Sequence, residues 1–169
     1  NVTLDKAPGS GRTIYLAQVS SDHNRISSAT RVRYLSNTSF DVMLQPQAKD
    51  YYNSVELLEE AIGYVAIEAG QAQGRLSSVV AGTMNADHNF QTASMPWTMK
   101  DLGVFAQLQT FAGHDTAVVS ASVPSGQTSS VKFKAREDTS RGNSISHTYE
   151  TVGYLNVELP LLPSLDDPL

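Results

Sequence analysis

The sequence predicts an all-β protein made of two tandem antiparallel β-sandwich repeats of about six strands each. Three observations carry this prediction. Apolar residues alternate with polar ones along many short segments, turn-forming residues separate these segments, and one nine-residue pattern occurs twice in the 169 residues. No segment has convincing helical spacing, so packed sheets are the remaining way to bury the apolar faces.

The repeat is anchored at two places. Residues 60–68 (EAIGYVAIE) and 150–158 (ETVGYLNVE) share Glu, Gly, Tyr and Glu at a shift of 90 residues. Residues 16–19 and 105–108 share an Ala-Gln pair at a shift of 89 residues. Two anchors at nearly one shift indicate duplicated units. The expected organisation is a first repeat at 1–69, a linker at 70–78, a second repeat at 79–159 and a C-terminal tail at 160–169.

The individual strands follow from a period of two residues. Val131, Phe133 and Ala135 alternate with three basic residues, which places the apolar side chains on a core face. The same pattern, with turns between, predicts strands at 14–19, 30–35, 40–45, 62–67, 104–110, 117–123 and 152–157, and shorter ones at 79–81 and 97–100.

The first repeat is incomplete at its front. About 27 residues separate the Ala-Gln anchor of the second repeat from Val79, whereas only 16 residues precede Ala17. Val2 and Thr3 can take the part of 97–98, but nothing corresponds to the strand at 79–81. Because bare sheet edges promote aggregation, we expect another segment, a neighbouring domain or a second copy of the chain to cover this edge.

Composition and missing motifs exclude several classes of function. The net charge is -5 and the 12 basic residues are scattered, which argues against nucleic-acid binding. Apolar runs reach only four or five residues, so we expect no membrane insertion. The absence of cysteine excludes thiolate zinc sites and disulfides. No hydrolase elbow, zinc-protease, phosphate-loop or dinucleotide motif is present, and we expect a non-catalytic protein.

Polar residues are expected to converge at one end of the second repeat. They are Arg136, Glu137 and Asp138 at the end of one predicted strand, and His147, Tyr149 and Glu150 at the start of the next. An arginine donor among carboxylate acceptors suits a hydroxyl-rich ligand; the alternative is a salt-bridged loop base. Oxygen ligands near Asp138 would allow a weak calcium site, and no transition metal or other cofactor is expected.

The repeated Glu-x-x-Gly-Tyr element is interpreted as structural rather than functional. We expect Gly63 and Gly153 to permit a close approach, and the following tyrosines to bury their rings. Glu60 and Glu150 are expected to tie down a loop.

The order of these elements resembles a known family. An Ala-Gln strand, a short Gly/Asp turn, a strand beginning near Thr30 or Thr116, a Ser39-Phe40 strand and Glu-x-x-Gly-Tyr-x-x-x-Glu follow one another. This resembles the tandem β-sandwich repeats of large secreted bacterial proteins, which are similar to the H-type lectin domain. The resemblance implies a six-stranded sandwich that binds N-acetylgalactosamine-type sugars and assembles as a trimer.

Some lectin sugar contacts carry over to this sequence. The family places an arginine early in the strand after the Gly/Asp turn, where Arg31 stands in the first repeat and Ala117 in the second. Asp87 and His88 approximate the family's Gly-x-Asp loop. The Trp-His pair of the lectins is missing from both repeats, so neither repeat keeps the full sugar site.

Two functions are therefore expected. The first is a non-catalytic carbohydrate-binding, lectin-like module of a secreted or cell-surface bacterial protein, with a polysaccharide or another glycan as partner. The alternative is a structural spacer or adhesin repeat that mediates reach or oligomerisation without a glycan ligand.

Overall fold

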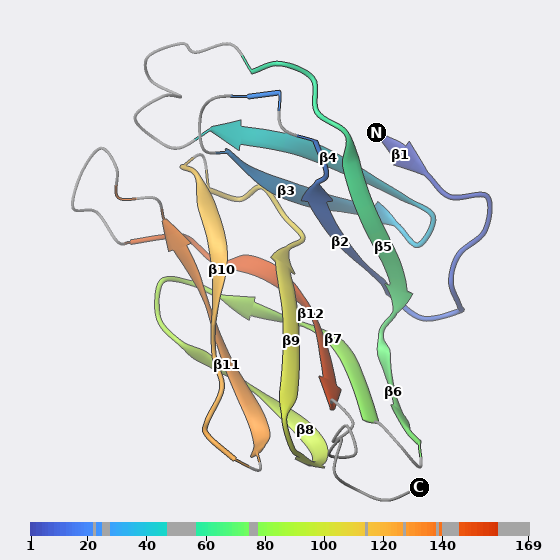
Figure 1. Cartoon of the computed structure of the whole chain (residues 1–169), viewed down its shortest axis with the longest axis vertical. Coiled ribbons are helices and arrows are strands. Elements are labelled where there is room, and N and C mark those ends of the chain that lie inside the picture. The colour runs from blue at the N-terminus through green and yellow to red at the C-terminus, as the bar shows by residue number, and fades with distance from the viewer. Residues whose placement is uncertain are drawn as a thin grey trace, which may run out of the picture.

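The protein is an all-β chain of antiparallel sheets in the computed structural model (Figure 1). The structure describes residues 1–21, 23–24, 28–46, 57–74, 78–113, 115–126, 128–137, 139 and 146–158. Within these ranges there is no helix, and the strands β1 to β12 form four sheets. The all-β fold class with antiparallel sheets, predicted by the alternation of apolar residues, is confirmed.

The first strand group comprises β1 to β5. Its sheets are β1-β4-β3 and β2-β5, with the bounds β1 Val2–Thr3, β2 Thr13–Val19, β3 Ser28–Ser36, β4 Ser39–Pro46 and β5 Ile62–Glu68. Tyr15 and Phe40 stack at 4.3 Å between ring centroids and bury Val32 beside them. These three residues form a small core.

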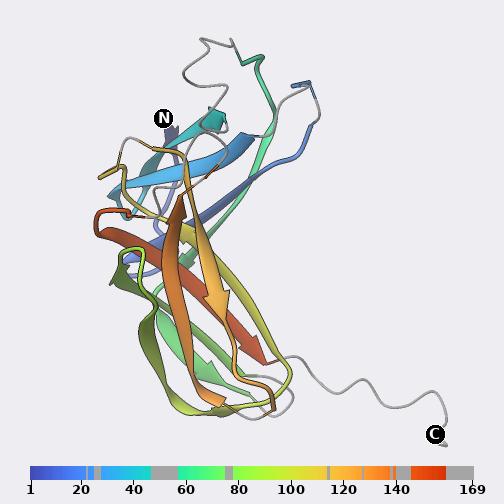
Figure 2. The same cartoon turned by 90° about the vertical axis from the view of Figure 1, so that its left-hand side faces the viewer.

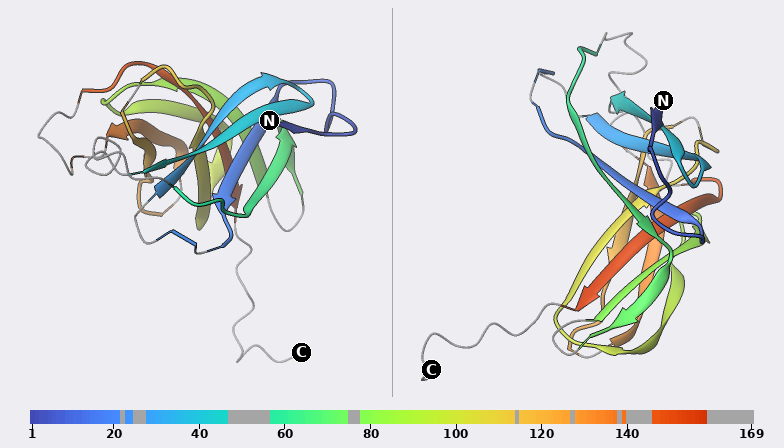
Figure 3. Two further views of the ribbon diagram at one scale, coloured as in Figure 1. Left: turned by 90° about the horizontal axis from the view of Figure 1, so that it is seen from above. Right: turned by 90° about the vertical axis from the view of Figure 1, so that its right-hand side faces the viewer.

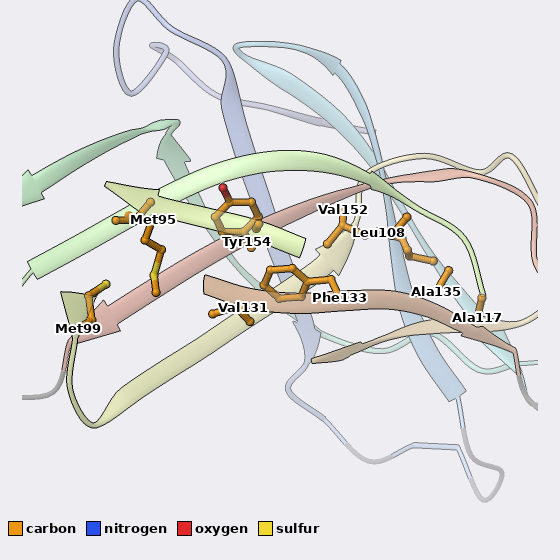
Figure 4. Close-up of a cluster of buried hydrophobic side chains, with 12 residues drawn as sticks. Met95, Met99, Leu108, Ala117, Val131, Phe133, Ala135, Val152 and Tyr154 are labelled. Atoms are coloured by element: carbon orange, nitrogen blue, oxygen red, sulfur yellow. The ribbon is translucent and has the colours of Figure 1, made fainter. Parts of the chain in front are cut away.

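The second strand group comprises β6 to β12. Its sheets are β6-β7-β12-β9 and β10-β11-β8, with the bounds β6 Gly70–Gln73, β7 Ser78–Ala86, β8 Gln91–Met99, β9 Leu102–Leu108, β10 Ala117–Ser122, β11 Thr128–Glu137 and β12 Glu150–Glu158. Residues of both sheets form one buried cluster, in which Phe133 stacks on Tyr154 at 5.2 Å (Figure 4). This core is much larger than that of the first group.

Two strand pairs share one register. Ala17 lies opposite Tyr64 in the β2-β5 pair, and Ala106 lies opposite Tyr154 in the β9-β12 pair. These are the residues that the sequence repeat aligns. The pairs differ on their other side, because β12 also pairs with β7, whereas β5 has only β2 as a partner among the described strands.

The segment after β5 is more regular than a linker. Gly70–Gln73 was expected to connect two domains, and it forms β6, which pairs with β7 from Gly70↔Ala81 to Gln73↔Ser78. The chain thus runs from β5 directly onto the edge of the second group's sheet (Figure 3). The two predicted short strands at 79–81 and 97–100 belong to nine-residue strands, β7 and β8.

The two strand groups meet where β2 crosses β9 and β12 (Figure 2). There, two glutamine side chains contact the edge of β2 that faces away from β5. Gln109 accepts a hydrogen bond from the Tyr15 N–H at 3.0 Å and donates one to the Tyr15 carbonyl at 2.6 Å. Gln107 accepts from the Ala17 N–H at 2.5 Å and donates to the Thr30 carbonyl at 3.0 Å. The two amides satisfy backbone groups that a neighbouring strand would otherwise pair.

Candidate functional site

The strongest concentration of buried charge lies between the two strand groups and begins with Arg31 on β3. Its side chain is 1% exposed, and its Nη2 donates to Glu150 Oε1 at 2.6 Å. The same guanidinium donates to the carbonyls of Thr110 at 3.2 Å and Gly113 at 3.0 Å. The Arg31 guanidinium also donates to Gln45 Oε1 of its own group at 3.3 Å, but most of its hydrogen bonds go to the second group's loop and carboxylate.

Glu150 begins β12 and holds the loop that follows β9. It accepts hydrogen bonds from the N–H groups of Ala112 at 3.1 Å and Gly113 at 2.9 Å, and from the Thr110 hydroxyl. Burial would raise the pKa of Glu150, but hydrogen bonds from His147, Thr110 and the two backbone N–H groups outweigh it and lower the pKa to about 2. The carboxylate is ionised at neutral pH.

His147 bridges two carboxylates. Its Nδ1 lies 3.0 Å from Glu137 Oε1 and its Nε2 lies 3.2 Å from Glu150 Oε1. Both ring nitrogens lie within hydrogen-bonding distance of a carboxylate oxygen, and the protonated ring is the form in which both nitrogens can donate. The hydrogen bond to Glu150, helped by that to Glu137, raises the pKa of His147 against the opposing effect of burial.

The polar network, defined as Arg31, Glu137, His147 and Glu150, unites residues that the sequence placed in different sites. Arg31 was expected in a lectin-like site of the first repeat, and the other three in a loop cluster of the second. Arg136 and Tyr149 of that cluster are exposed and outside the network. Asp138, with the expected weak calcium site, lies outside the described residues.

Asp87 and His88 form a turn next to the network. Asp87 Oδ1 accepts a hydrogen bond from the Asn89 N–H at 2.8 Å, which lowers the pKa of Asp87. His88 Nδ1 is 3.5 Å from the His147 carbonyl. An aspartate that bonds the backbone two residues on is a common turn-forming arrangement, so this pair shapes the loop beside His147.

The first strand group contains a matching but simpler arrangement at Glu60. This carboxylate accepts from the Ser21 hydroxyl at 2.5 Å and from the N–H groups of His23 at 2.9 Å and Asn24 at 2.8 Å. The hydrogen bond from Ser21, followed by those from Asn24, lowers the pKa of Glu60 to about 2. The expectation that Glu60 and Glu150 tie down a loop is confirmed.

A groove lies between the two strand groups. Its volume is about 1170 Å³ and its walls come from β2, β3, β5, β9, β10 and β12. Tyr64, Phe105 and Val118 line it, and each is exposed over more than two fifths of its surface. Exposed apolar side chains gathered in a concave site are typical of a binding surface.

Sequence reasoning missed this groove. A signal was present, because alternation places Phe105 on the face of its strand opposite to the buried one. Sequence alone does not show which outer faces of the two groups meet. A smaller cavity of about 240 Å³ lies beside Arg136 and Glu137.

Metal and membrane features are not found in the described ranges. There, no three histidine or acidic side chains are arranged to hold a metal ion. No helix in the same ranges is long and apolar enough to cross a bilayer. The chain matches no protein-family model, no curated protein and no solved structure.

Proposed function

We propose that the chain consists of two tandem β-sandwich repeats, at 1–69 and 79–159, and serves as a non-catalytic spacer or adhesin repeat of a secreted or cell-surface bacterial protein. The observation that carries this proposal is the buried ion pair of Arg31 and Glu150, which joins the two strand groups. The matching registers around Tyr64 and Tyr154 support the division into repeats.

The chemistry of the polar network favours a structural role over ligand binding. Both oxygens of Glu150 and Oε1 of Glu137 already have hydrogen-bond partners within the chain, and the side chains of the network are at most 8% exposed. A buried ion pair adds little net stability over apolar packing, yet it requires one relative placement of its partners. Fixed placement of consecutive units is the property a spacer needs.

Distances between the strand groups test this proposal. The chain has no cysteine, so Leu35→Cys on β3 and Ser122→Cys on β10 can carry spin labels without background labelling. We expect one narrow distance distribution, and a broader one after Arg31→Met with Glu150→Met. A broad distribution in the chain without the Arg31 and Glu150 substitutions contradicts the spacer proposal.

The second candidate function is carbohydrate binding, and the groove favours it. Exposed Tyr64 and Phe105 offer apolar ring surface, and Gln18 and Ser20 on the wall of the groove offer hydrogen-bonding groups. In this second proposal a glycan binds in the groove rather than at the polar network. Its partner would be a polysaccharide or another hydroxyl-rich glycan.

A glycan array distinguishes the two functions. Binding that Phe105→Ser removes and Arg136→Ser leaves intact supports a glycan site in the groove, because Arg136 is also exposed but lies outside the groove. Binding lost only in Arg136→Ser would instead assign the site to the predicted loop cluster. Absence of binding by the unsubstituted chain leaves the spacer function.

A further inference from the structure

The edge of β5 that faces away from β2 carries outward-directed backbone groups at alternate residues. At the ends of the β2-β5 ladder, Ser20 N–H donates to the Ala61 carbonyl at 2.8 Å and Ala69 N–H donates to the Arg12 carbonyl at 2.7 Å. The N–H and C=O groups of the odd-numbered residues of β5 therefore point toward β2. Those of Ile62, Tyr64 and Ala66 point outward, away from β2. Among the described residues no strand pairs with this edge.

The corresponding edge of β12 is occupied. Gln109 N–H donates to the Thr151 carbonyl at 2.7 Å, so the backbone N–H and C=O groups of odd-numbered residues of β12 point toward β9. Those of even-numbered residues point toward β7, the same alternation as on β5. Tyr154, the counterpart of Tyr64, lies opposite Gly82 of β7. Among the described strands, none takes on β5 the position that β7 fills on β12.

Gly82 shows what such a strand needs. A Cβ atom at this glycine would lie 2.5 Å from the Tyr154 hydroxyl, so the tyrosine ring occupies the space that a side chain would take. Tyr154 is 8% exposed, whereas Tyr64 is 45% exposed. Tyr64 already packs against Phe40 at 5.2 Å, the distance at which Tyr154 packs against Phe133. The ring planes meet at 66° in the first pair and at 20° in the second, and a covering strand is found only over Tyr154 among the described residues.

We infer that β5 binds an extended strand supplied by a separate polypeptide segment, with glycine opposite Tyr64 and small apolar residues at alternate positions, as in β7. This inference rests on the proposed tandem repeat. A second folded copy of the chain cannot lend its own β7, because β6 and β12 pair with both edges of that strand. The added strand covers Ile62 to Ala66, since the Glu68 side chain is bonded to the Gly11 N–H at 2.5 Å.

A labelled peptide with the sequence of residues 78–86 tests the inference on the full chain. We expect binding by fluorescence anisotropy, with the amide exchange of Tyr64 and Ala66 slowed at least tenfold. A Gly82→Val peptide should bind at least tenfold more weakly, because its side chain would meet the Tyr64 ring. N-methylation at Gly82 should weaken binding equally, whereas N-methylation at Ala81, whose N–H points away from β5, should not.

A protein variant gives a matching control. Ala66→Pro removes one outward N–H while leaving the β2 ladder donors in place, and should weaken peptide binding at least tenfold. Retained exchange protection at the Tyr15 amide shows that the variant is folded. If the variant does not fold, the modified peptides still test the inference on the unsubstituted chain.

Three results would overturn the inference: no binding at millimolar peptide, equal binding of the Gly82→Val peptide, or dimers of the chain that Ala66→Pro abolishes. The last result would assign the edge to a second copy. A narrow spin-label distance distribution together with failed peptide binding would remove this inference alone and leave the spacer proposal standing.

Discussion

At the scale of single residues, Arg31 is the most consequential side chain. Burial lowers the pKa of Arg31, and the opposing charge of Glu150 offsets this, so the guanidinium stays protonated in the interior. Removing one member of a buried ion pair leaves the other charge without compensation. The energetic effect of substitution is therefore large even where the intact pair adds little net stability.

Arg31→Met should lower the free energy of unfolding by about 3–5 kcal/mol, measured by urea denaturation. Arg33→Met is the control, because Arg33 is on the same strand but is exposed and pairs with Asp41 at the surface, and it should cost far less. Adding Glu150→Met to Arg31→Met should restore part of the loss. Equal effects of the two arginine substitutions would show that Arg31 is not a buried partner.

The stability of the folded protein should pass through a maximum as the pH is varied and decline on both the acid and the alkaline side. The pKa of Glu150 is about 2 in the folded protein against an ordinary 4.5, so its stabilisation is complete above pH 4.5 and is lost as the pH falls toward 2. The raised pKa of His147 acts oppositely: its contribution is complete below the ordinary 6.5 and is lost as the pH rises through the folded value. Thermal unfolding should show highest stability between about pH 4.5 and 6.5.

His147→Gln is the matched variant for the pH profile. It should remove the decline on the alkaline side and leave much of the acid decline, since Glu60 also has a pKa of about 2. An unchanged alkaline decline in this variant would mean that another group is responsible.

The sequence identified all four residues of the polar network as candidate site residues, but it did not predict that they contact one another. Glu137, His147 and Glu150 were recognised as one cluster because they lie at the end of one strand and the start of the next in sequence, although β11 and β12 belong to different sheets and do not pair as a hairpin. Arg31 was recognised separately, because its partner depends on how two strand groups are oriented, and no local pattern encodes that orientation. The resemblance to a lectin directed attention to ligand contacts, whereas the described contacts of Arg31 are within the chain.

At the scale of strands, two glycines at equivalent positions have different surroundings. A Cβ atom at Gly153 would lie 2.7 Å from Ile14 Cγ2 and 2.8 Å from Gln109 Cδ, whereas at Gly63 only the Gln18 carbonyl comes within 4.0 Å. The close approach expected at both glycines is therefore found at Gly153 alone, where the two strand groups touch.

Gly153→Ala should destabilise the protein by about 1–3 kcal/mol, because Ile14 and Gln109 are both buried and have little room to shift. Gly63→Ala should be close to neutral. Denaturation midpoints of the two variants provide the comparison, and equal midpoints would contradict close packing of β2 on β12.

Gln109→Leu tests the capping of β2. It keeps the side-chain volume but leaves the Tyr15 N–H and C=O without partners, at a cost of about 1–3 kcal/mol. The Tyr15 amide should exchange faster in this variant, whereas Gln71→Leu, at an exposed position on β6, should change nothing at Tyr15. Unchanged Tyr15 protection in Gln109→Leu would refute the cap.

The strands themselves were predictable because alternation is a local signal. Val131, Phe133 and Ala135 are buried as their spacing predicts. β6 was not predicted, because its glycine and glutamines match a linker and its pairing comes from β7, a strand that alternation marked only in part. The contact of Gln109 with Tyr15 could not be predicted from the sequence either. A side-chain amide can pair with the backbone of β2 only where no neighbouring strand occupies that edge.

At the scale of the whole molecule, the two strand groups are bound to each other by paired charges, amide caps and a close glycine contact. Each link takes one residue from each group: Arg31 with Glu150, Tyr15 with Gln109, and Ile14 with Gly153. The small core of the first group gives it limited stability of its own. We therefore expect the second group to stabilise the first, so that both unfold together.

Equilibrium urea unfolding, followed by two probes, tests this coupling most directly. Trp97, the only tryptophan, packs against the core of the second group, and protection of the Ile14 amide, which faces β5, reports on the first. We expect coincident transitions in the unsubstituted chain, and earlier loss of the Ile14 signal in Arg31→Met. Separate transitions in the unsubstituted chain would contradict the claim that the polar network couples the unfolding of the two groups. Coincident transitions that persist in Arg31→Met would contradict it as well.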